Sequence, residues 1–185
     1  MPSLTYSFLR SLKCNLQDYP VFIETGTNEG KTIFAMEPFF NTLHTIELSE
    51  HYYTNTKARY TGNKINFVLG DSATKLQQIF ETLNENSIVF LDGHWSGGNT
   101  AKGFKDCPLV EEITLVANYC KKSCILIVDD FRLFSKGPQQ GYNEDWSEIN
   151  KDKLLAILGS RVEDVYHLDS ECAKDDRLII HVCGK

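Results

Sequence analysis

Short apolar runs alternate along the chain with longer segments in which apolar residues recur every three or four positions. The short runs have the length and composition of buried strands, and the longer segments have the spacing of amphipathic helices. Such alternation is typical of α/β proteins, in which right-handed crossovers build a mostly parallel sheet covered on both faces. The pattern predicts seven strands, at Pro20–Glu24, Leu43–Glu47, Ile65–Leu69, Ser87–Asp92, Cys124–Asp129, Arg161–Leu168 and Arg177–Val182, and helices at Gly30–Phe40, Glu50–Tyr60, Ser72–Leu83 and Pro108–Tyr119.

The last two predicted strands are separated only by Asp169–Asp176. A parallel crossover needs a dozen or more residues, so these strands should form an antiparallel hairpin. We therefore predict a single Rossmann-like, doubly wound α/β domain over residues 1–185, with a mostly parallel seven-stranded sheet and an antiparallel C-terminal hairpin strand. This architecture resembles that of class I S-adenosylmethionine-dependent methyltransferases, whereas a dinucleotide-binding dehydrogenase domain keeps its sheet parallel.

A glycine turn follows the first strand, where Val21–Thr32 runs from an apolar segment through two glycines into a helix. Glycines let a nucleotide-like ligand approach the backbone, and the helix N-terminus presents free N–H groups. Gly26–Thr32 also comes close to the phosphate loop of NTPases, with Ile125–Asp129 as the acidic strand. It is one residue short, and Glu24 and Glu29 would place negative charge beside a triphosphate. A sulfonium cofactor suits these charges better, with a nucleotide-binding or NTPase module as the alternative.

Acidic residues end the first three predicted strands: Glu24, Glu47 and Asp71. Glu47 lies at about the 20-residue spacing expected of a carboxylate that binds a ribose diol. The resemblance places Asp71 near the adenine amino group, and capping of the next helix is the alternative role for Asp71 or Ser72. The predicted S-adenosylmethionine-binding residues are Glu24, Thr25, Gly26, Thr27, Asn28, Gly30, Thr32, Glu47, Leu48, Asp71, Ser72 and Asp92.

The fourth and fifth strands end in a second polar group, formed by Asp92, His94, Asp129 and Asp130. Neighbouring strands lie about 4.8 Å apart, so the three carboxylates could converge. They would repel one another unless a cation such as Mg²⁺ lay among them. His94 is the candidate general base, with Asp92 and Asp130 beside it as catalytic residues. The alternative is that the carboxylates cap loops or pair with basic side chains, and that the histidine packs beside Trp95.

Taken together, the motifs resemble the small sugar O-methyltransferases of large DNA viruses and some bacteria, distant relatives of the macrocin and novobiocin-type sugar O-methyltransferases. In the antibiotic-sugar enzymes three aspartates hold Mg²⁺, which implies Asp92, Asp129 and Asp130 here. His94 stands where those enzymes have a catalytic aspartate, and this difference leaves the metal requirement open. The motifs concerned are Glu24–Thr27, Thr45–Ser49, Leu69–Ser72, Leu91–Trp95, Ile127–Arg132 and Asp176–His181.

Two long loops, Gly93–Cys107 and Phe131–Trp146, should complete the site, because long loops in compact domains are usually functional. Their aromatic side chains could stack on a sugar, and their polar side chains could bind hydroxyl groups. Packing in small satellite clusters is the alternative. The predicted substrate-binding residues are Trp95, Lys102, Asp106, Arg132, Tyr142 and Trp146.

Composition narrows the partners and the location. The net charge of -6 and the lack of a basic cluster argue against nucleic acid. The first residues lack the apolar core of a signal peptide, and no apolar run is long enough to cross a membrane, so we expect a cytoplasmic protein. Six cysteines without a C-x-x-C pair predict reduced thiols. The sequence leaves open whether the chain forms a homodimer.

The functional prediction is an S-adenosylmethionine-dependent O-methyltransferase that acts on a sugar hydroxyl of a glycan or nucleotide sugar. His94 would remove the proton, and magnesium assistance is left open. An O-methyltransferase of a catechol or another small phenol is the alternative within the same class.

Overall fold

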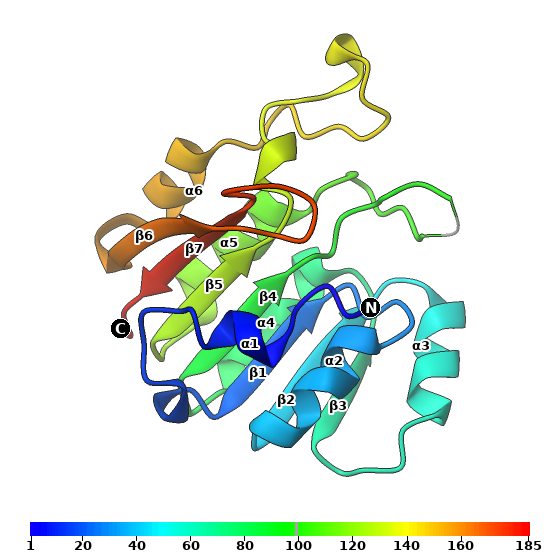
Figure 1. The fold of residues 1–185 in the computed structure, drawn as a ribbon, viewed down its shortest axis with the longest axis vertical. Coiled ribbons are helices and arrows are strands. Elements are labelled where there is room, and N and C mark those ends of the chain that lie inside the picture. Colours follow the sequence, from blue (N-terminus) through cyan, green and yellow to red (C-terminus); the bar gives the residue numbers. More distant parts are fainter. Residues whose placement is uncertain (99) are drawn as a thin grey trace.

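Within residues 1–98 and 100–185, which this computed structural model describes, seven strands form one sheet in the order β3-β2-β1-β4-β5-β7-β6 (Figure 1). All seven predicted strands are present, and each end lies within one residue of its predicted position. The strands are β1 (Val21–Thr25), β2 (Thr42–Glu47), β3 (Ile65–Leu69), β4 (Ser87–Leu91), β5 (Cys124–Val128), β6 (Val162–Leu168) and β7 (Arg177–Val182).

Strands β1 to β5 are parallel to one another, and β7 runs antiparallel to both β5 and β6. The prediction of a C-terminal antiparallel hairpin is therefore confirmed. Because β1 to β5 share one direction, their carboxyl ends lie along a single edge of the sheet, as Figure 1 shows. The loops that carry the predicted chemistry all begin at this edge.

Alternating side chains of each strand contribute to two hydrophobic cores, one on each face of the sheet. In β5, for example, Leu126 and Val128 belong to the core beneath α4, α5 and α6, whereas Ile125 and Ile127 belong to the core beneath α1 and α2. Apolar side chains on both faces explain why β4 and β5 are nearly continuous apolar runs rather than alternating ones.

The helices mostly follow the predicted segments. The segment predicted as Gly30–Phe40 ends its α-helix at Met36 and continues as a 3₁₀ turn over Glu37–Phe39, where Pro38 lacks the N–H that a continuing helix needs. Helices α1 and α6 were not predicted. The helices are α1 (Tyr6–Leu9), α2 (Lys31–Met36), α3 (Glu50–Ala58), α4 (Ser72–Thr82), α5 (Leu109–Tyr119) and α6 (Lys151–Leu158).

None of the helices in the described part of the chain has the length and apolar character needed to span a bilayer. The six cysteines are free thiols, and Cys107, Cys120 and Cys124 are buried. Half of the cysteines therefore fill the core, whereas Cys14 and Cys183 are partly buried and Cys172 is exposed.

Candidate functional site

A cavity of about 640 Å³ lies at the carboxyl edge of the parallel strands. Its wall comes from the turns after β1 to β5, from the loop between β6 and β7, and from the first three residues of the chain. Nine of the twelve predicted cofactor-binding residues line it: Gly26, Thr27, Asn28, Thr32, Glu47, Leu48, Asp71, Ser72 and Asp92.

Gly26 allows the turn after β1 to pass close to the end of β4. Its φ is +85°, and a Cβ atom at this position would lie 2.3 Å from the backbone oxygen of Asp92. A larger residue would therefore clash with the backbone and be strained in addition. Gly26 therefore brings the turn after β1 against the end of β4.

The other three predicted cofactor residues, Glu24, Thr25 and Gly30, lie behind the cavity wall rather than on it. Glu24 is 1% exposed and accepts a hydrogen bond of 2.8 Å from Thr45 Oγ1. Thr25 is fully buried and accepts a hydrogen bond from the backbone N–H of Asp92 at 3.2 Å. Gly30 is buried at the start of α2. In this structure the three residues contact the surrounding fold rather than the cavity, and their predicted role in cofactor binding stays a prediction.

Glu47 and Asp71 reach the cavity while also fixing the backbone around it. Glu47 Oε2 accepts from the N–H of Asn28 and Oε1 from that of Ser49, both at 2.7 Å. Asp71 Oδ1 accepts a hydrogen bond from the N–H of Ala73 at 2.9 Å, so Asp71 caps α4, which was the alternative role predicted for it. Capping and exposure to the cavity are compatible, because a carboxylate offers about four acceptor sites.

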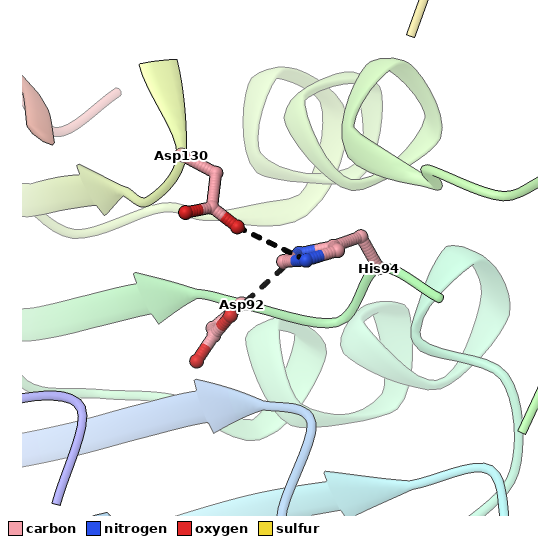
Figure 2. A group of neighbouring side chains, drawn as sticks. All are labelled: Asp92, His94 and Asp130. Atoms are coloured by element: carbon pink, nitrogen blue, oxygen red, sulfur yellow. Dashed lines mark ion pairs between the residues drawn. The ribbon is translucent and has the colours of Figure 1, made fainter. Parts of the chain in front are cut away.

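His94 lies between the ends of β4 and β5, with its imidazole held by carboxylates on two sides (Figure 2). Its Nε2 is 3.0 Å from Asp130 Oδ2, and its Nδ1 is 3.6 Å from Asp92 Oδ1. Both contacts are ion pairs when the imidazole is protonated, and the one to Asp130 is the closer. The closer carboxylate favours a proton on Nε2, and in the neutral imidazole this leaves the lone pair of Nδ1 available.

The pKa values of His94, Asp92 and Asp130 are shifted in different ways. Burial alone would lower the pKa of His94, but the hydrogen bond to Asp130 and the neighbouring carboxylates raise it above the ordinary value. Burial raises the pKa of Asp92 to about 7, although His94 lowers it. For Asp130, burial is outweighed by His94 and Arg132, which keep its pKa below the usual range. Asp130 is therefore the ionised partner that orients the imidazole.

A third carboxylate near His94 comes from Glu144, which the sequence analysis did not single out. Its Oε2 lies 3.9 Å from His94 Nε2 and accepts a hydrogen bond of 3.0 Å from Trp146 Nε1. The ring of Trp146 meets the imidazole edge-on, with 4.9 Å between centroids. No local pattern in the sequence distinguishes this glutamate, because a loop without periodicity brings it to the site.

Trp146 and Tyr142 do not line the main cavity, contrary to their predicted role in binding substrate. Trp146 is 3% exposed and belongs to the hydrophobic core, where it also packs against Phe134. Tyr142 lines a separate cavity of about 270 Å³. Trp146 also lines this second cavity, and Tyr142 is 38% exposed, so neither aromatic packs in a satellite cluster of its own.

Among the remaining predicted substrate residues, Trp95 and Arg132 line the cavity, but Lys102 and Asp106 do not. Lys102 Nζ forms an ion pair of 2.7 Å with Asp106 and lies 4.2 Å from the centroid of the Trp95 ring. The backbone N–H of Trp95 donates to the carbonyl of Asp106 at 2.7 Å. Lys102 and Asp106 thus shape the loop that carries Trp95.

The three aspartates predicted to bind magnesium do not come together as one set. Asp129 Oδ1 accepts from Arg177 Nε at 3.2 Å on the side of the sheet covered by the N-terminal segment. Among the described residues two sets converge within 4.8 Å, one of Asp92, His94 and Asp130 and the other of Asp129, Asp130 and Asp176.

Arginine side chains already neutralise several of the aspartates that lie near the ends of the strands. Arg177 pairs with Asp129, and Arg132 Nη1 donates to both Asp130 and Asp176. The argument for a divalent ion rested on unpaired carboxylates, so these residues do not fit the magnesium site that the sequence predicted.

No protein-family model matches the sequence, and no curated protein matches it. Solved structures resemble the fold across nearly the whole chain. One is a protein of Listeria monocytogenes assigned to the S-adenosylmethionine-dependent methyltransferases, with 14% identity, a TM-score of 0.53 and 97% of each chain covered. Another is CalS10 of Micromonospora echinaspora, an amino pentose methyltransferase of calicheamicin biosynthesis, with 10% identity, a TM-score of 0.59, and 90% of this chain and 84% of that one covered.

The N-methyltransferase NodS of Bradyrhizobium japonicum matches with 11% identity and a TM-score of 0.57, covering 91% of this chain and 89% of that one. The fold is that of class I methyltransferases. At these identities the likeness extends to the fold alone. In the class I methyltransferase fold seen here, His94, Asp92 and Asp130 stand at the carboxyl ends of the two central strands β4 and β5.

Proposed function

We propose that the protein is an S-adenosylmethionine-dependent O-methyltransferase that transfers a methyl group to a sugar hydroxyl, with His94 as the general base. The main support is the imidazole whose Nε2 is bound by an ionised aspartate and whose Nδ1 is unbound, beside a cavity of about 640 Å³. The general class rests on the fold shared with S-adenosylmethionine-dependent methyltransferases.

The residues around the cavity fit this cofactor. Gly26 leaves room for a ligand close to the backbone, and the carboxylates of Glu47 and Asp71 line the wall. An acidic wall favours a sulfonium cation and disfavours a triphosphate, since like charges repel in a partly enclosed site. When bound, the cofactor supplies an electrophilic methyl group.

His94 would accept the proton that the acceptor hydroxyl loses as its oxygen takes the methyl group. Asp130 holds the imidazole in the tautomer with a free Nδ1 and stabilises the positive charge that develops on it. Asp92 borders the same space and positions the hydroxyl. An alcohol is much less acidic than a phenol, so a sugar acceptor needs such a base more than a catechol does.

The test compares His94→Gln and His94→Ala with the wild type for turnover of a sugar panel and for affinity toward S-adenosylhomocysteine. We expect turnover to fall by about 10²- to 10⁴-fold while S-adenosylhomocysteine affinity stays near the wild-type value. His51→Gln, an exposed histidine on α3, is the matched control. Full activity in either His94 variant would remove the residue from the mechanism.

Two further measurements separate the alternatives. Thermal shift with S-adenosylhomocysteine against ATP tests the cofactor class, and stabilisation by ATP alone would contradict a methyltransferase. Turnover of catechols in preference to sugars would contradict the sugar acceptor and leave the cofactor assignment intact.

A further inference from the structure

The acceptor end of the cavity is the part lined by residues after β4 and β5 and by the loop between β6 and β7. Ser170 in that loop donates a hydrogen bond of 2.6 Å to Asp176, which in turn binds Arg132. The loop therefore belongs to the same side of the cavity as His94. Its charged lining residues are Asp92, Lys105, Asp129, Asp130, Arg132, Glu171 and Arg177.

Both arginines at the acceptor end are already engaged by carboxylates of the protein. Arg177, whose side chain is 5% exposed, binds Asp129 and the carbonyl oxygen of Ser3. Arg132 binds Asp130 and Asp176 through the same nitrogen, so one guanidinium serves two carboxylates. The positive charge of each arginine is therefore balanced by at least one carboxylate of the protein.

The other two basic residues on the cavity wall are also paired. Lys31 Nζ lies 2.5 Å from Glu29, and Lys105 Nζ lies 2.7 Å from Glu111. Both lysine side chains are largely exposed, so these pairs are weak and screened by salt. Lys31 is the first residue of α2, whereas Lys105 belongs to the loop after β4 and also pairs with Glu148 at 3.4 Å.

Carboxylates outnumber cations at the acceptor end. Among the described residues, Glu171 forms no ion pair, and Asp92 has only His94 beside it. A phosphate group would meet these charges, and each arginine or lysine side chain at this end is already paired with a carboxylate. In a partly enclosed cavity such repulsion is screened less than in water.

We propose that the acceptor is a sugar without an anionic group, neutral or bearing an ammonium group, and that sugar phosphates and nucleotide sugars are excluded by charge. This inference rests on the proposed function and narrows its substrate class from glycans and nucleotide sugars to uncharged or amino-substituted glycosides.

The experiment measures binding of matched sugar sets to the complex with S-adenosylhomocysteine. Each matched set holds a hexose methyl glycoside, the 2-amino and 6-phosphate derivatives of that glycoside, and the corresponding uridine diphosphate hexose, in the gluco, galacto and manno series. Saturation-transfer NMR ranks affinity, and methyl transfer from S-adenosylmethionine ranks kcat/KM. We expect the anionic members to be at least ten-fold poorer than their neutral or amino counterparts in every series that binds. An anionic member that binds or reacts as well as its neutral counterpart overturns the inference.

A charge-reversal variant tests the electrostatic cause. Glu171→Lys should improve the anionic members relative to the neutral ones several-fold, with little change in S-adenosylhomocysteine affinity. Glu163→Lys, on the exposed face of β6 away from the cavity, makes the same change in net charge as a control. An unchanged ratio in Glu171→Lys, or an equal change in Glu163→Lys, overturns the proposal. Failure of the wild type to bind S-adenosylhomocysteine would instead contradict the proposed function.

Discussion

Glu112 lies on α5 directly behind the candidate site, with 1% of its surface exposed. Its Oε1 has no hydrogen-bond partner among the described residues, and a Cβ on Gly93 would lie 3.1 Å from it. Burial raises the pKa of Glu112 to about 7, although the hydroxyls of Ser72 and Thr25 lower it. We predict that Glu112→Gln, which keeps the shape of the side chain but cannot ionise, stabilises the protein above pH 7.

The magnitude follows from the two pKa values of this carboxyl group. An ordinary glutamate in the unfolded chain has a value of 4.5, and the folded value is about 7. Because the folded value is higher, the stabilisation that Glu112 contributes is fully present below pH 4.5 and is lost as pH rises through 7. At about 1.4 kcal/mol per pH unit, the loss amounts to about 3 kcal/mol.

Urea unfolding of the wild type and Glu112→Gln between pH 4 and pH 8 measures this difference. The two proteins should have similar free energies of unfolding at pH 4, and the variant should be more stable by about 3 kcal/mol at pH 8. In thermal unfolding this corresponds to a Tm higher by roughly 5–10 °C at pH 8. Glu85→Gln, at an exposed glutamate, should show no such divergence.

A variant that is equally stable or less stable than the wild type at pH 8 would refute the reasoning. Such a result would mean that ionisation of Glu112 does not lower the free energy of unfolding, and that a hydrogen-bond partner stabilises its Oε1. A difference that is independent of pH would point to packing rather than to ionisation.

Three further predictions concern the site itself. Asp130→Asn removes the charge that raises the pKa of His94, so the rise of kcat with pH should move to lower pH and its plateau should fall about ten-fold or more; a pH profile unchanged from wild type would contradict this. Gly26→Ala should cost about 1–3 kcal/mol of stability and weaken S-adenosylhomocysteine binding, measured by calorimetry, because the new methyl group would meet the backbone oxygen of Asp92. Turnover should persist in EDTA, since arginines pair with the carboxylates that magnesium would need; loss of activity restored by Mg²⁺ would count against that view.

Much of the fold could be predicted because both faces of the sheet are buried. Strands β4 and β5 at the centre of the sheet are then nearly continuous apolar runs, and such runs are visible without knowledge of the neighbours. Helix α6 was missed because it is short and follows a long irregular segment. Its start does carry a signal, since Asn150 caps the helix by accepting from the N–H of Lys153 at 2.9 Å.

The site was predictable only as far as sheet geometry determines it. Leu91 pairs with Val128 across β4 and β5, so Asp92 and the two aspartates after Val128 had to lie near one another. Which aspartate faces His94 depends on the turn. Asp130 has a φ of +58°, and this left-handed conformation brings its carboxylate to the imidazole while Asp129 pairs with Arg177. The sequence contains no local signal for that turn, which is why the predicted magnesium set included Asp129.

The contribution of the loop after β5 shows why the site combines predictable and unpredictable parts. The end of β4 holds Asp92 and the turn after β5 holds Asp130, whereas Glu144 lies near His94 because it is bound to Trp146, which is buried in the core. Trp146 donates a hydrogen bond from Nε1 to Glu144, and its ring contacts the imidazole of His94. One buried side chain therefore positions both of these residues. Burial of an aromatic residue is a long-range packing event, and local sequence patterns do not reveal its partner. The orientation of the base therefore depends on tertiary packing of this loop as well as on the sheet.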